Sequence, residues 1–354
     1  MKTSDFDYEL PASFIAQTPV EPRDSSRLLV LHRDTGTVEH RIFRQVGDYL
    51  HKGDLLVLNE TRVIPARIFA RKETGGRVEL LLLRREDEIT WQCLVGGKGL
   101  RVGIKVNVEN GPRAEILKKD EGSQRLIQFS EPIEPFFRQA GNVPLPPYIH
   151  KKLSDPERYQ TVYSNEPGSA AAPTAGLHFT RRLMEELREQ GVRIAFVTLH
   201  VGLDTFAPVT ENDPERHRIH TEWCHIPQET ADIINQTRSA GARVIAVGTT
   251  SVRTLESAAG IGSQKTGNQQ EQDPGITHSD FLVSPFTGHT SLFILPGYRF
   301  KIVDSMLTNF HLPKSTLLML VSAFAGRDRI LGTYEIAKRA GYRFYSFGDA
   351  MIIL

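Results

Sequence analysis

The segment with the clearest chemical potential is a run of small residues that ends in a histidine. From Gly168 to Thr180 the chain reads G-S-A-A-A-P-T-A-G-L-H-F-T. Small side chains let backbone N–H and C=O groups approach a flat or polar ligand, and Pro173 stiffens the turn. A low-complexity linker is the alternative, but Leu177 and Phe179 would anchor the segment to a core. We therefore expect a ligand-binding wall that includes Ala171, Ala172, Thr174 and Gly176, with His178 at its end.

A second candidate lies where a buried strand runs into a helix. The stretch Val244–Ser257, V-I-A-V-G-T-T-S-V-R-T-L-E-S, has an apolar strand that ends at Gly248 and an amphipathic helix after it. The free N–H groups of that helix would face the crevice at the carboxyl end of the strand, where a carboxylate or phosphate could bind. Simple capping by Thr249, Thr250 or Ser251 is the alternative.

Histidines stand at the ends of several expected elements. His200 closes the strand R-I-A-F-V-T-L-H-V, and His311 lies in L-T-N-F-H-L-P. His217 and His220, with Glu222, could suggest a metal site, but their spacing fits no zinc helix motif and prolines bracket an irregular loop. We expect no metal, and a single histidine is more often a hydrogen-bonded structural residue than a catalyst.

Two kinds of sequence must position these residues. From Phe69 to Phe129, short alternating runs separated by Gly-rich turns predict antiparallel strands in a small barrel or sandwich. From Thr180 onward, helices alternate with nearly all-apolar strands, which is typical of parallel pairing, and 55–58 is another such strand. We predict an α/β domain with a buried sheet, residues 1–62 and 150–354, interrupted by an inserted small all-β barrel domain, residues 63–149.

Individual elements of the α/β part can be named from their patterns. The expected helices are Thr180–Gln190, which stops at Gly191, and Pro227–Ser239. The expected strands are 193–201 and 243–248. Residues 260–275 are polar, Gly-rich and without periodicity, and we interpret them as a surface loop.

Composition limits the class of protein. The net charge is +1 and the two cysteines, Cys93 and Cys224, are far apart, which favours reduced thiols in a cytoplasmic protein. The N-terminus carries acids and a proline where a signal peptide needs an apolar core, and no apolar run is long enough to cross a membrane. Between Arg62 and Arg125, fourteen basic residues face nine acidic ones, so the inserted barrel carries about +5 and is a plausible phosphate-backbone platform; an uneven solvated face is the alternative.

Several long motifs, in one order along essentially the whole chain, resemble the S-adenosylmethionine:tRNA ribosyltransferase-isomerases of the queuosine pathway. They include G-D-L-L-V-L-N-E-T-R-V-I-P-A-R from Gly53, the small-residue run from Gly168, T-L-H-V-G from Thr198, V-G-T-T-S-V-R-T-L-E, and V-D-S-M-L-T-N-F-H-L-P-K-S-T from Val303. Two features depart from the family pattern. Asp204 stands where the family usually has glycine, and the region 260–288 is longer than expected.

The resemblance implies a reaction as well as an inserted barrel. The ribosyl part of S-adenosylmethionine is moved to 7-aminomethyl-7-deazaguanine at the wobble position of a tRNA with a GUN-type anticodon. It is isomerised there to give epoxyqueuosine, and adenine and methionine leave. S-adenosylmethionine is thus a consumed substrate, and we expect no further cofactor, no membrane partner and a monomer.

The same resemblance suggests roles for the candidate residues. The sulfonium acidifies the neighbouring 5′ carbon, so a neutral base is needed, for which His178 and His200 are candidates. Departure of adenine needs a proton donor, for which Glu222, Asp304 and His311 are candidates. The methionine carboxylate would suit Thr249, Thr250 and Arg253. For the tRNA, the candidates are Arg62, Arg67, Lys98, Arg101 and Lys314 on phosphates and Tyr148 or Tyr163 in base stacking.

Two other classes of protein remain as alternatives. An S-adenosylmethionine-dependent tRNA methyltransferase would carry an early Gly-rich turn between strand and helix, and this chain lacks one. It would also release S-adenosylhomocysteine and no adenine. A non-catalytic tRNA-binding protein would take up no S-adenosylmethionine.

Overall fold

The computed structural model describes residues 1–354 except 121, 152, 203–207, 220 and 262–280. Its largest feature is a nine-stranded mixed sheet with the order β18-β14-β13-β3-β15-β19-β20-β1-β2. The strands are β1 (Arg27–Leu31), β2 (Val38–Ile42), β3 (Leu55–Asn59), β13 (Arg193–Leu199), β14 (Glu222–Ile226), β15 (Val244–Val247), β18 (Phe286–Thr290), β19 (Ser305–Asn309) and β20 (Ala350–Ile353). The four central strands, β13, β3, β15 and β19, run parallel, as the apolar strand pattern predicts.

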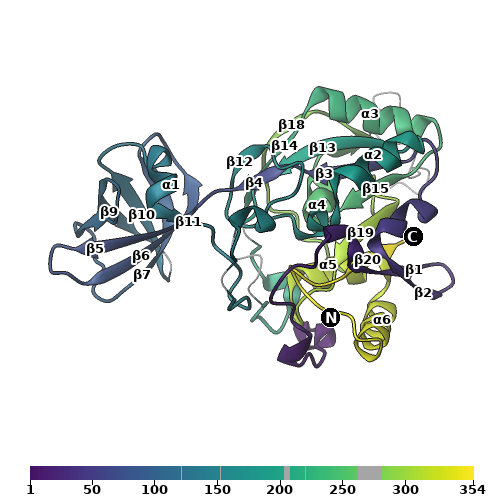
Figure 1. The fold of residues 1–354 in the computed structure, drawn as a ribbon, viewed down its shortest axis with the longest axis horizontal. Coiled ribbons are helices and arrows are strands. Elements are labelled where there is room, and N and C mark those ends of the chain that lie inside the picture. Colours follow the sequence, from purple (N-terminus) through teal and green to yellow (C-terminus); the bar gives the residue numbers. More distant parts are fainter. Residues whose placement is uncertain (121, 152, 203–207, 220, 262–280) are drawn as a thin grey trace.

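The sheet is buried on both faces because its apolar residues alternate between two cores. In β3, Leu55 and Val57 join one hydrophobic cluster and Leu56 and Leu58 join the other. The first cluster is covered by α3 (Gln228–Ser239), α4 (Thr249–Ser257), α5 (Thr316–Ala325) and α6 (Arg327–Arg339), and the second by α2 (Arg181–Glu189). The predicted α/β class with a buried sheet is therefore confirmed (Figure 1).

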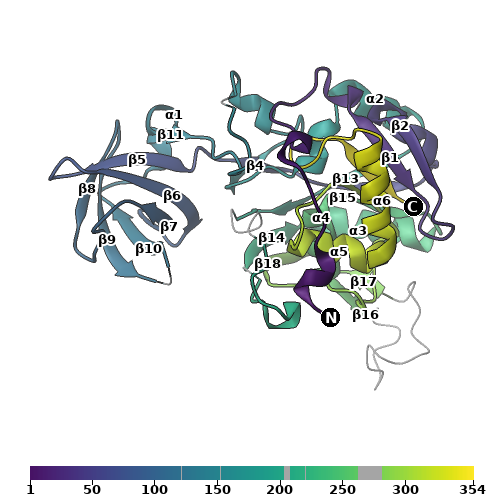
Figure 2. The same ribbon diagram turned by 90° about the horizontal axis from the view of Figure 1, so that it is seen from below.

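The inserted segment forms a closed antiparallel barrel. Its strands are β5 (Arg67–Lys72), β6 (Arg77–Arg85), β7 (Thr90–Gly96), β8 (Lys105–Val108), β9 (Arg113–Lys119) and β10 (Gln124–Phe129), and pairing of β5 with β8 closes the ring. The barrel has its own hydrophobic cluster and stands apart from the α/β domain in both views (Figures 1 and 2). The glycines from Gly96 to Gly103 end β7 and connect it to β8, as predicted for a turn.

Two chain segments join the barrel to the α/β domain. Outward runs β4 (Thr61–Val63), which pairs with β12 (Glu166–Ser169), and the return follows α1 (Phe137–Ala140) and β11 (Gly141–Asn142). The barrel cluster ends at Ala140, whereas Val143, Leu145 and Ile149 pack with residues of the α/β domain. The predicted boundaries at 62/63 and 149/150 stay a prediction.

Local signals explain where the helices begin. Thr180 accepts a hydrogen bond from the backbone N–H of Leu183 and caps α2, and Pro227 precedes α3, close to the predicted starts. The predicted capping of α4 by a hydroxyl is not observed. The cap is Gly248 itself, whose φ of 87° suits glycine, so the three hydroxyl residues lie inside the first turn.

The remaining short strands, β16 (Ala259–Ile261) and β17 (Phe281–Val283), pair with each other. Most of the loop predicted at 260–275 lies outside the described residues, as does Asp204. Among the helices that the structure describes, none is long and apolar enough to span a bilayer.

Candidate functional site

A cavity lies at one edge of the large sheet. That edge collects the carboxyl ends of β15 and β19 and the residues just before β20, because β20 runs antiparallel to β19. The carboxyl edge is where open α/β sheets bind ligands. The cavity, here called the edge pocket, is lined by Tyr148, Ala172–Ala175, Val201, Gly248–Thr250, Thr308–Leu312, Ser315, Leu317, Tyr345 and Ser346.

The small-residue segment forms one wall of the edge pocket, in part as predicted. Ala172 and Thr174 line it, and Ala171 stands behind it in a β-bridge to Val201. Gly176 faces elsewhere, because a Cβ on it would lie 2.0 Å from the Tyr163 hydroxyl oxygen. Its small size therefore makes room for an internal tyrosine rather than a ligand.

Two helices begin at the edge pocket. Thr249 and Thr250 belong to the first turn of α4, and Ser315, the N-cap of α5, also lines the pocket together with Leu317. The buried Thr250 hydroxyl has no hydrogen-bond partner among the described residues. The lining residues include no Asp, Glu, Lys or Arg within the described part of the chain, so the N–H groups of these helix starts supply its positive potential.

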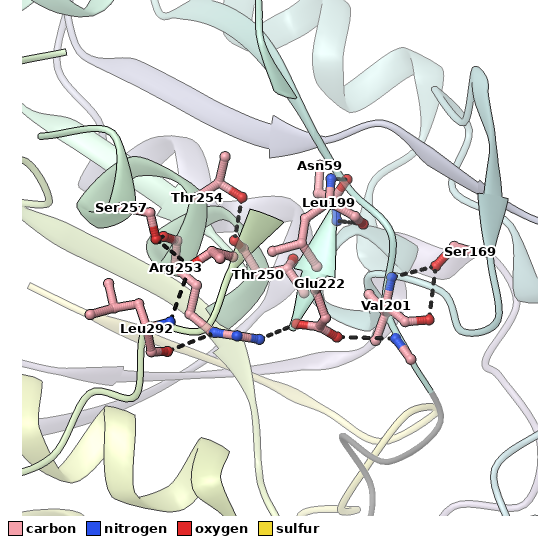
Figure 3. Close-up of polar contacts among 12 residues, drawn as sticks. Asn59, Ser169, Leu199, Val201, Glu222, Thr250, Arg253, Thr254, Ser257 and Leu292 are labelled. Atoms are coloured by element: carbon pink, nitrogen blue, oxygen red, sulfur yellow. Dashed lines mark hydrogen bonds and ion pairs between the residues drawn. The ribbon is translucent and has the colours of Figure 1, made fainter. Parts of the chain in front are cut away.

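Arg253 does not reach the edge pocket, contrary to its predicted role. Figure 3 shows its guanidinium directed at the Glu222 carboxylate, and both side chains are buried. Glu222 also accepts a hydrogen bond from the Gly202 N–H at 3.0 Å, and Arg253 donates to the Leu292 carbonyl at 3.1 Å. The ion pair thus joins α4 to the chain after β13. It leaves Glu222 a poor candidate to protonate adenine.

His178 is also displaced from its predicted position. It is buried behind the wall, stacked on Phe43 with ring centroids 5.0 Å apart, and it lines a separate smaller cavity. Its Nδ1 lies 2.7 Å from the Ser26 hydroxyl and its Nε2 lies 3.1 Å from Asn309 Nδ2. Burial, assisted by Arg343 and Arg23, lowers the pKa of His178 to about 3. The ring is therefore neutral and both nitrogens are engaged.

His200 stands beside the edge pocket and does not line it. Its Nδ1 lies 2.8 Å from the Thr61 hydroxyl, its ring stacks on Trp223, and a Cβ on Gly168 would lie 2.5 Å from its Nε2. Burial lowers its pKa to about 4. These contacts favour a structural role at the point where the chain leaves for the barrel.

His311 is the one predicted catalytic residue that lines the edge pocket. Its Nε2 lies 2.7 Å from the Thr308 hydroxyl, and its backbone N–H donates to the Tyr334 hydroxyl oxygen at 3.0 Å. Burial lowers the pKa of His311 to about 3, so it is a neutral imidazole at pH 7. A neutral imidazole has one nitrogen that can accept a proton and one N–H, and the role of His311 as a donor to adenine stays a prediction.

Asp304 lies at the opposite edge of the sheet. It precedes β19, whereas the edge pocket takes the residues that end this strand. Its carboxylate accepts the Val244 N–H at the start of β15 at 2.8 Å. Five strand residues separate the two edges by ~16 Å, so Asp304 is not part of this pocket.

The residues predicted to contact tRNA fall into three groups. Lys98 and Arg101 are exposed on the barrel, and Arg67 is paired there with Glu79 at 3.0 Å. Arg62 on β4 pairs with Glu157, and Lys314 pairs with Asp7 at 2.7 Å. The third group comprises Tyr148 and Tyr163.

The two predicted stacking tyrosines are both half-buried but differ in their surroundings. Tyr148 lines the edge pocket, with its hydroxyl 2.7 Å from Ser346 and its ring 4.8 Å from that of Tyr345. Tyr163 is packed against Gly176 and Phe196, and burial raises the pKa of its hydroxyl. Tyr163 therefore does not line the edge pocket.

Five polar residues of the edge pocket were missed by the sequence analysis: Thr308, Asn309, Ser315, Tyr345 and Ser346. Polar Thr308 and Asn309 end an otherwise apolar strand at its carboxyl end, and that pattern could have identified them. For Tyr345 and Ser346 no local pattern indicates a site.

The possible metal site at His217, His220 and Glu222 is a separate question. His217 pairs with Glu211, and no cluster of three metal-ligating side chains occurs within the described residues; His220 lies outside them.

We expect the three buried histidines to make the protein acid-labile. Their folded pKa values, about 3 for His178 and His311 and about 4 for His200, lie below the ordinary 6.5. The unfolded chain therefore binds more protons below pH 6.5, and the free energy of unfolding falls as pH falls from there toward 4. Each histidine contributes up to about 1.4 kcal/mol per pH unit to this fall in the free energy of unfolding.

Urea denaturation at pH 7, 6 and 5, followed through Trp223, measures this slope. His178→Gln should reduce the slope by one group's share. Equal slopes for wild type and His178→Gln would contradict the assignment of a neutral buried ring.

Comparisons with known proteins identify the family of this chain. The family model for a queuosine biosynthesis protein matches residues 3–353. The S-adenosylmethionine:tRNA ribosyltransferase-isomerases of Carboxydothermus hydrogenoformans and Moorella thermoacetica are each 52% identical, with 100% of both chains covered. The crystal structure of the S-adenosylmethionine tRNA ribosyltransferase of Thermotoga maritima is 41% identical, with a TM-score of 0.55, and covers 99% of this chain and 100% of its own. The chain therefore belongs to the queuosine biosynthesis protein family.

Proposed function

We propose that this protein is an S-adenosylmethionine:tRNA ribosyltransferase-isomerase. It transfers the ribosyl part of S-adenosylmethionine to the aminomethyl group of 7-aminomethyl-7-deazaguanine, at the wobble position of a tRNA with a GUN-type anticodon. The ribosyl group is isomerised to the epoxycyclopentane of epoxyqueuosine, and adenine and methionine are released. Full-length identity of 52% to relatives with this name supports the activity.

The edge pocket is the observation that carries the proposal. It lies at the carboxyl edge of the sheet, and its wall of Ala172–Ala175 allows a flat base to approach the backbone. The methionine carboxylate is placed at the first turn of α4, where Thr249 and Thr250 line the pocket. Arg253 has no part in that contact because its guanidinium is paired with Glu222.

His311 is the proposed base. The sulfonium makes the protons on the adjacent 5′ carbon acidic, and the neutral ring of His311 lines the same cavity. The proton of the 5′ carbon moves to the imidazole, and the C5′–H electron pair stays on carbon, next to the positive sulfur. S-adenosylmethionine is consumed, and we propose no further cofactor.

The position of the barrel supports its role as a tRNA platform. β3 ends at the same sheet edge as the pocket, and β4 leads from there to the barrel. An anticodon arm held on the barrel would therefore present its loop near the pocket. Tyr148, which belongs to the segment that returns from the barrel, lines this pocket. We further propose a monomer that works in the cytoplasm.

Mass spectrometry tests the whole reaction. An anticodon stem-loop that carries 7-aminomethyl-7-deazaguanine is incubated with the enzyme and S-adenosylmethionine. We expect the oligonucleotide to gain the isomerised ribosyl group, with free adenine and methionine in equal amounts. A methylated oligonucleotide with S-adenosylhomocysteine would instead indicate a methyltransferase, and unchanged reactants with bound tRNA would indicate a binding protein.

Neutralising two exposed cations on the barrel should weaken tRNA binding in a salt-dependent way. We expect Lys98→Ala with Arg101→Ala to lower the slope of log Kd against log salt by about 1.5, because each lost phosphate contact removes ~0.7. The matched control is Lys52→Ala with Arg188→Ala, which removes the same charge from exposed positions on the α/β domain. Fluorescence anisotropy of a labelled stem-loop at several salt concentrations measures both. Equal slopes for the two double variants would exclude the platform.

A further inference from the structure

A chain of hydrogen bonds runs from the edge pocket into the protein. Thr174, which lines the pocket, lies 2.9 Å from Asn309 Oδ1. Asn309 Nδ2 lies 3.1 Å from His178 Nε2, and His178 Nδ1 lies 2.7 Å from the Ser26 hydroxyl. The four residues come from three distant parts of the sequence, since Thr174 and His178 share one short segment. They meet at the carboxyl edge of the sheet, where Asn309 ends β19 and Ser26 precedes β1.

The direction of each hydrogen bond in this chain is fixed. Asn309 Nδ2 also faces the backbone carbonyl of Tyr345 at 3.4 Å, and a carbonyl can only accept. The amide oxygen therefore faces Thr174, which must donate its hydroxyl proton to it. The amide nitrogen donates to His178 Nε2, so this nitrogen must be unprotonated. His178 Nδ1 then carries the proton and donates to Ser26.

These hydrogen-bond directions require His178 to be neutral. A protonated ring would present N–H at Nε2 and would repel the amide N–H of Asn309. The amide would then have to turn over and would offer an N–H to Thr174. Burial and the charges of Arg343 and Arg23 lower the pKa of His178 to about 3, so this reversal does not occur near pH 7.

We infer that His178 is a positioning residue that acts through Asn309. It keeps the hydroxyl proton of Thr174 in a hydrogen bond to the amide oxygen of Asn309. Thr174 consequently offers only oxygen lone pairs to the edge pocket, and it recognises an N–H or O–H donor of the substrate. On the proposed function, that donor belongs to S-adenosylmethionine. The chain of hydrogen bonds thus makes Thr174 a hydrogen-bond acceptor in its contact with the substrate, while His178 itself touches no substrate.

A double-mutant cycle with S-adenosylmethionine as the probe tests this coupling. Thr174→Val should raise the KM for S-adenosylmethionine about three- to tenfold, because it removes one acceptor, with kcat within threefold of wild type. His178→Leu should raise KM by a similar factor, and the double variant should be no worse than either single one. His178→Gln restores an acceptor toward Asn309 and should return KM toward the wild-type value. Thr174→Ser keeps the hydroxyl and should do the same.

A purely structural role for His178 predicts a different outcome. In that case the effects of Thr174→Val and His178→Leu on KM would multiply, and KM would follow the loss of melting temperature. If His178→Leu does not fold, Asn309→Leu takes its place in the cycle, since it breaks the same link. A base at position 178 would show as a large loss of kcat and a changed pH profile in His178→Gln, which would also overturn the inference.

The cycle separates this inference from the proposed function. Calorimetric titration of wild type and variants with S-adenosylmethionine measures the same coupling as a Kd, with no need for turnover. Wild-type binding without release of adenine would contradict the proposed function and leave the cycle interpretable. Normal turnover with an unchanged KM and Kd in Thr174→Val would contradict the inference alone.

Discussion

His311→Gln should lower kcat for adenine release by about 10²-fold or more, because a positioned base contributes ~10²–10⁴ to the rate. His311 is the predicted catalytic histidine whose side chain lines the edge pocket, and glutamine keeps a polar group of similar length there. The backbone contacts of residue 311 with Tyr334 and Tyr8 do not depend on its side chain, so the pocket should keep its shape. Affinity for S-adenosylmethionine should change little.

The pH profile provides an independent measurement. Because the pKa of His311 is about 3, the ring is unprotonated throughout pH 5–8, and its protonation should give kcat/KM no acidic limb in that range. His200→Gln is the matched control, since that histidine stands beside the pocket without lining it. Retention of a third or more of kcat in His311→Gln would rule it out as the base.

Glu222→Ala should lower the free energy of unfolding of the α/β domain by about 3–5 kcal/mol. The substitution leaves the Arg253 guanidinium buried opposite a gap and removes the acceptor of the Gly202 N–H. A buried charge that loses its partner destabilises the fold by its full desolvation free energy. A surface ion pair, by contrast, contributes ~1 kcal/mol or less to the free energy of unfolding. Glu186→Ala, which breaks the exposed pair with Arg182 on α2 of the same domain, is therefore the matched control.

The two tryptophans make this measurement specific to a domain. Trp91 lies in the barrel and Trp223 follows Glu222 in β14, so a Trp91→Phe background reports unfolding of the α/β domain alone. Glu222→Leu with Arg253→Met removes both charges and should recover most of the lost stability. A loss in Glu222→Ala no larger than that in Glu186→Ala would show that the pair is effectively solvated.

Patterns local in the sequence predicted the fold well. The strand 55–58, the helix after Thr180 and the barrel from alternating runs are all set by periodicity, turn residues and caps, which act over a few residues. The small-residue run likewise placed Ala172 and Thr174 at the pocket. The hydroxyls after Gly248 were placed correctly at the start of α4, although the glycine is the cap.

Side-chain partners could not be predicted in the same way, because they depend on contacts between distant segments. Arg253 and Glu222 are 31 residues apart and meet only when α4 packs beside β14. Asp304 and His311 are close in sequence, yet a strand carries them to opposite edges of the sheet. Gly176 looked like part of a ligand wall until the position of Tyr163 was known.

The order of strands in the large sheet has a consequence for how the protein is made. Leu28 in β1 pairs with Ala350 in β20, about 320 residues later. At ~5–20 residues per second, the ribosome needs ~15–65 s to deliver that neighbour. During this interval the β1–β2 hairpin has an open apolar edge, while the barrel, whose partners are all local, can already fold. Nascent chains should therefore depend on chaperones for the early hairpin, and premature translation stops upstream of β20 should yield aggregates.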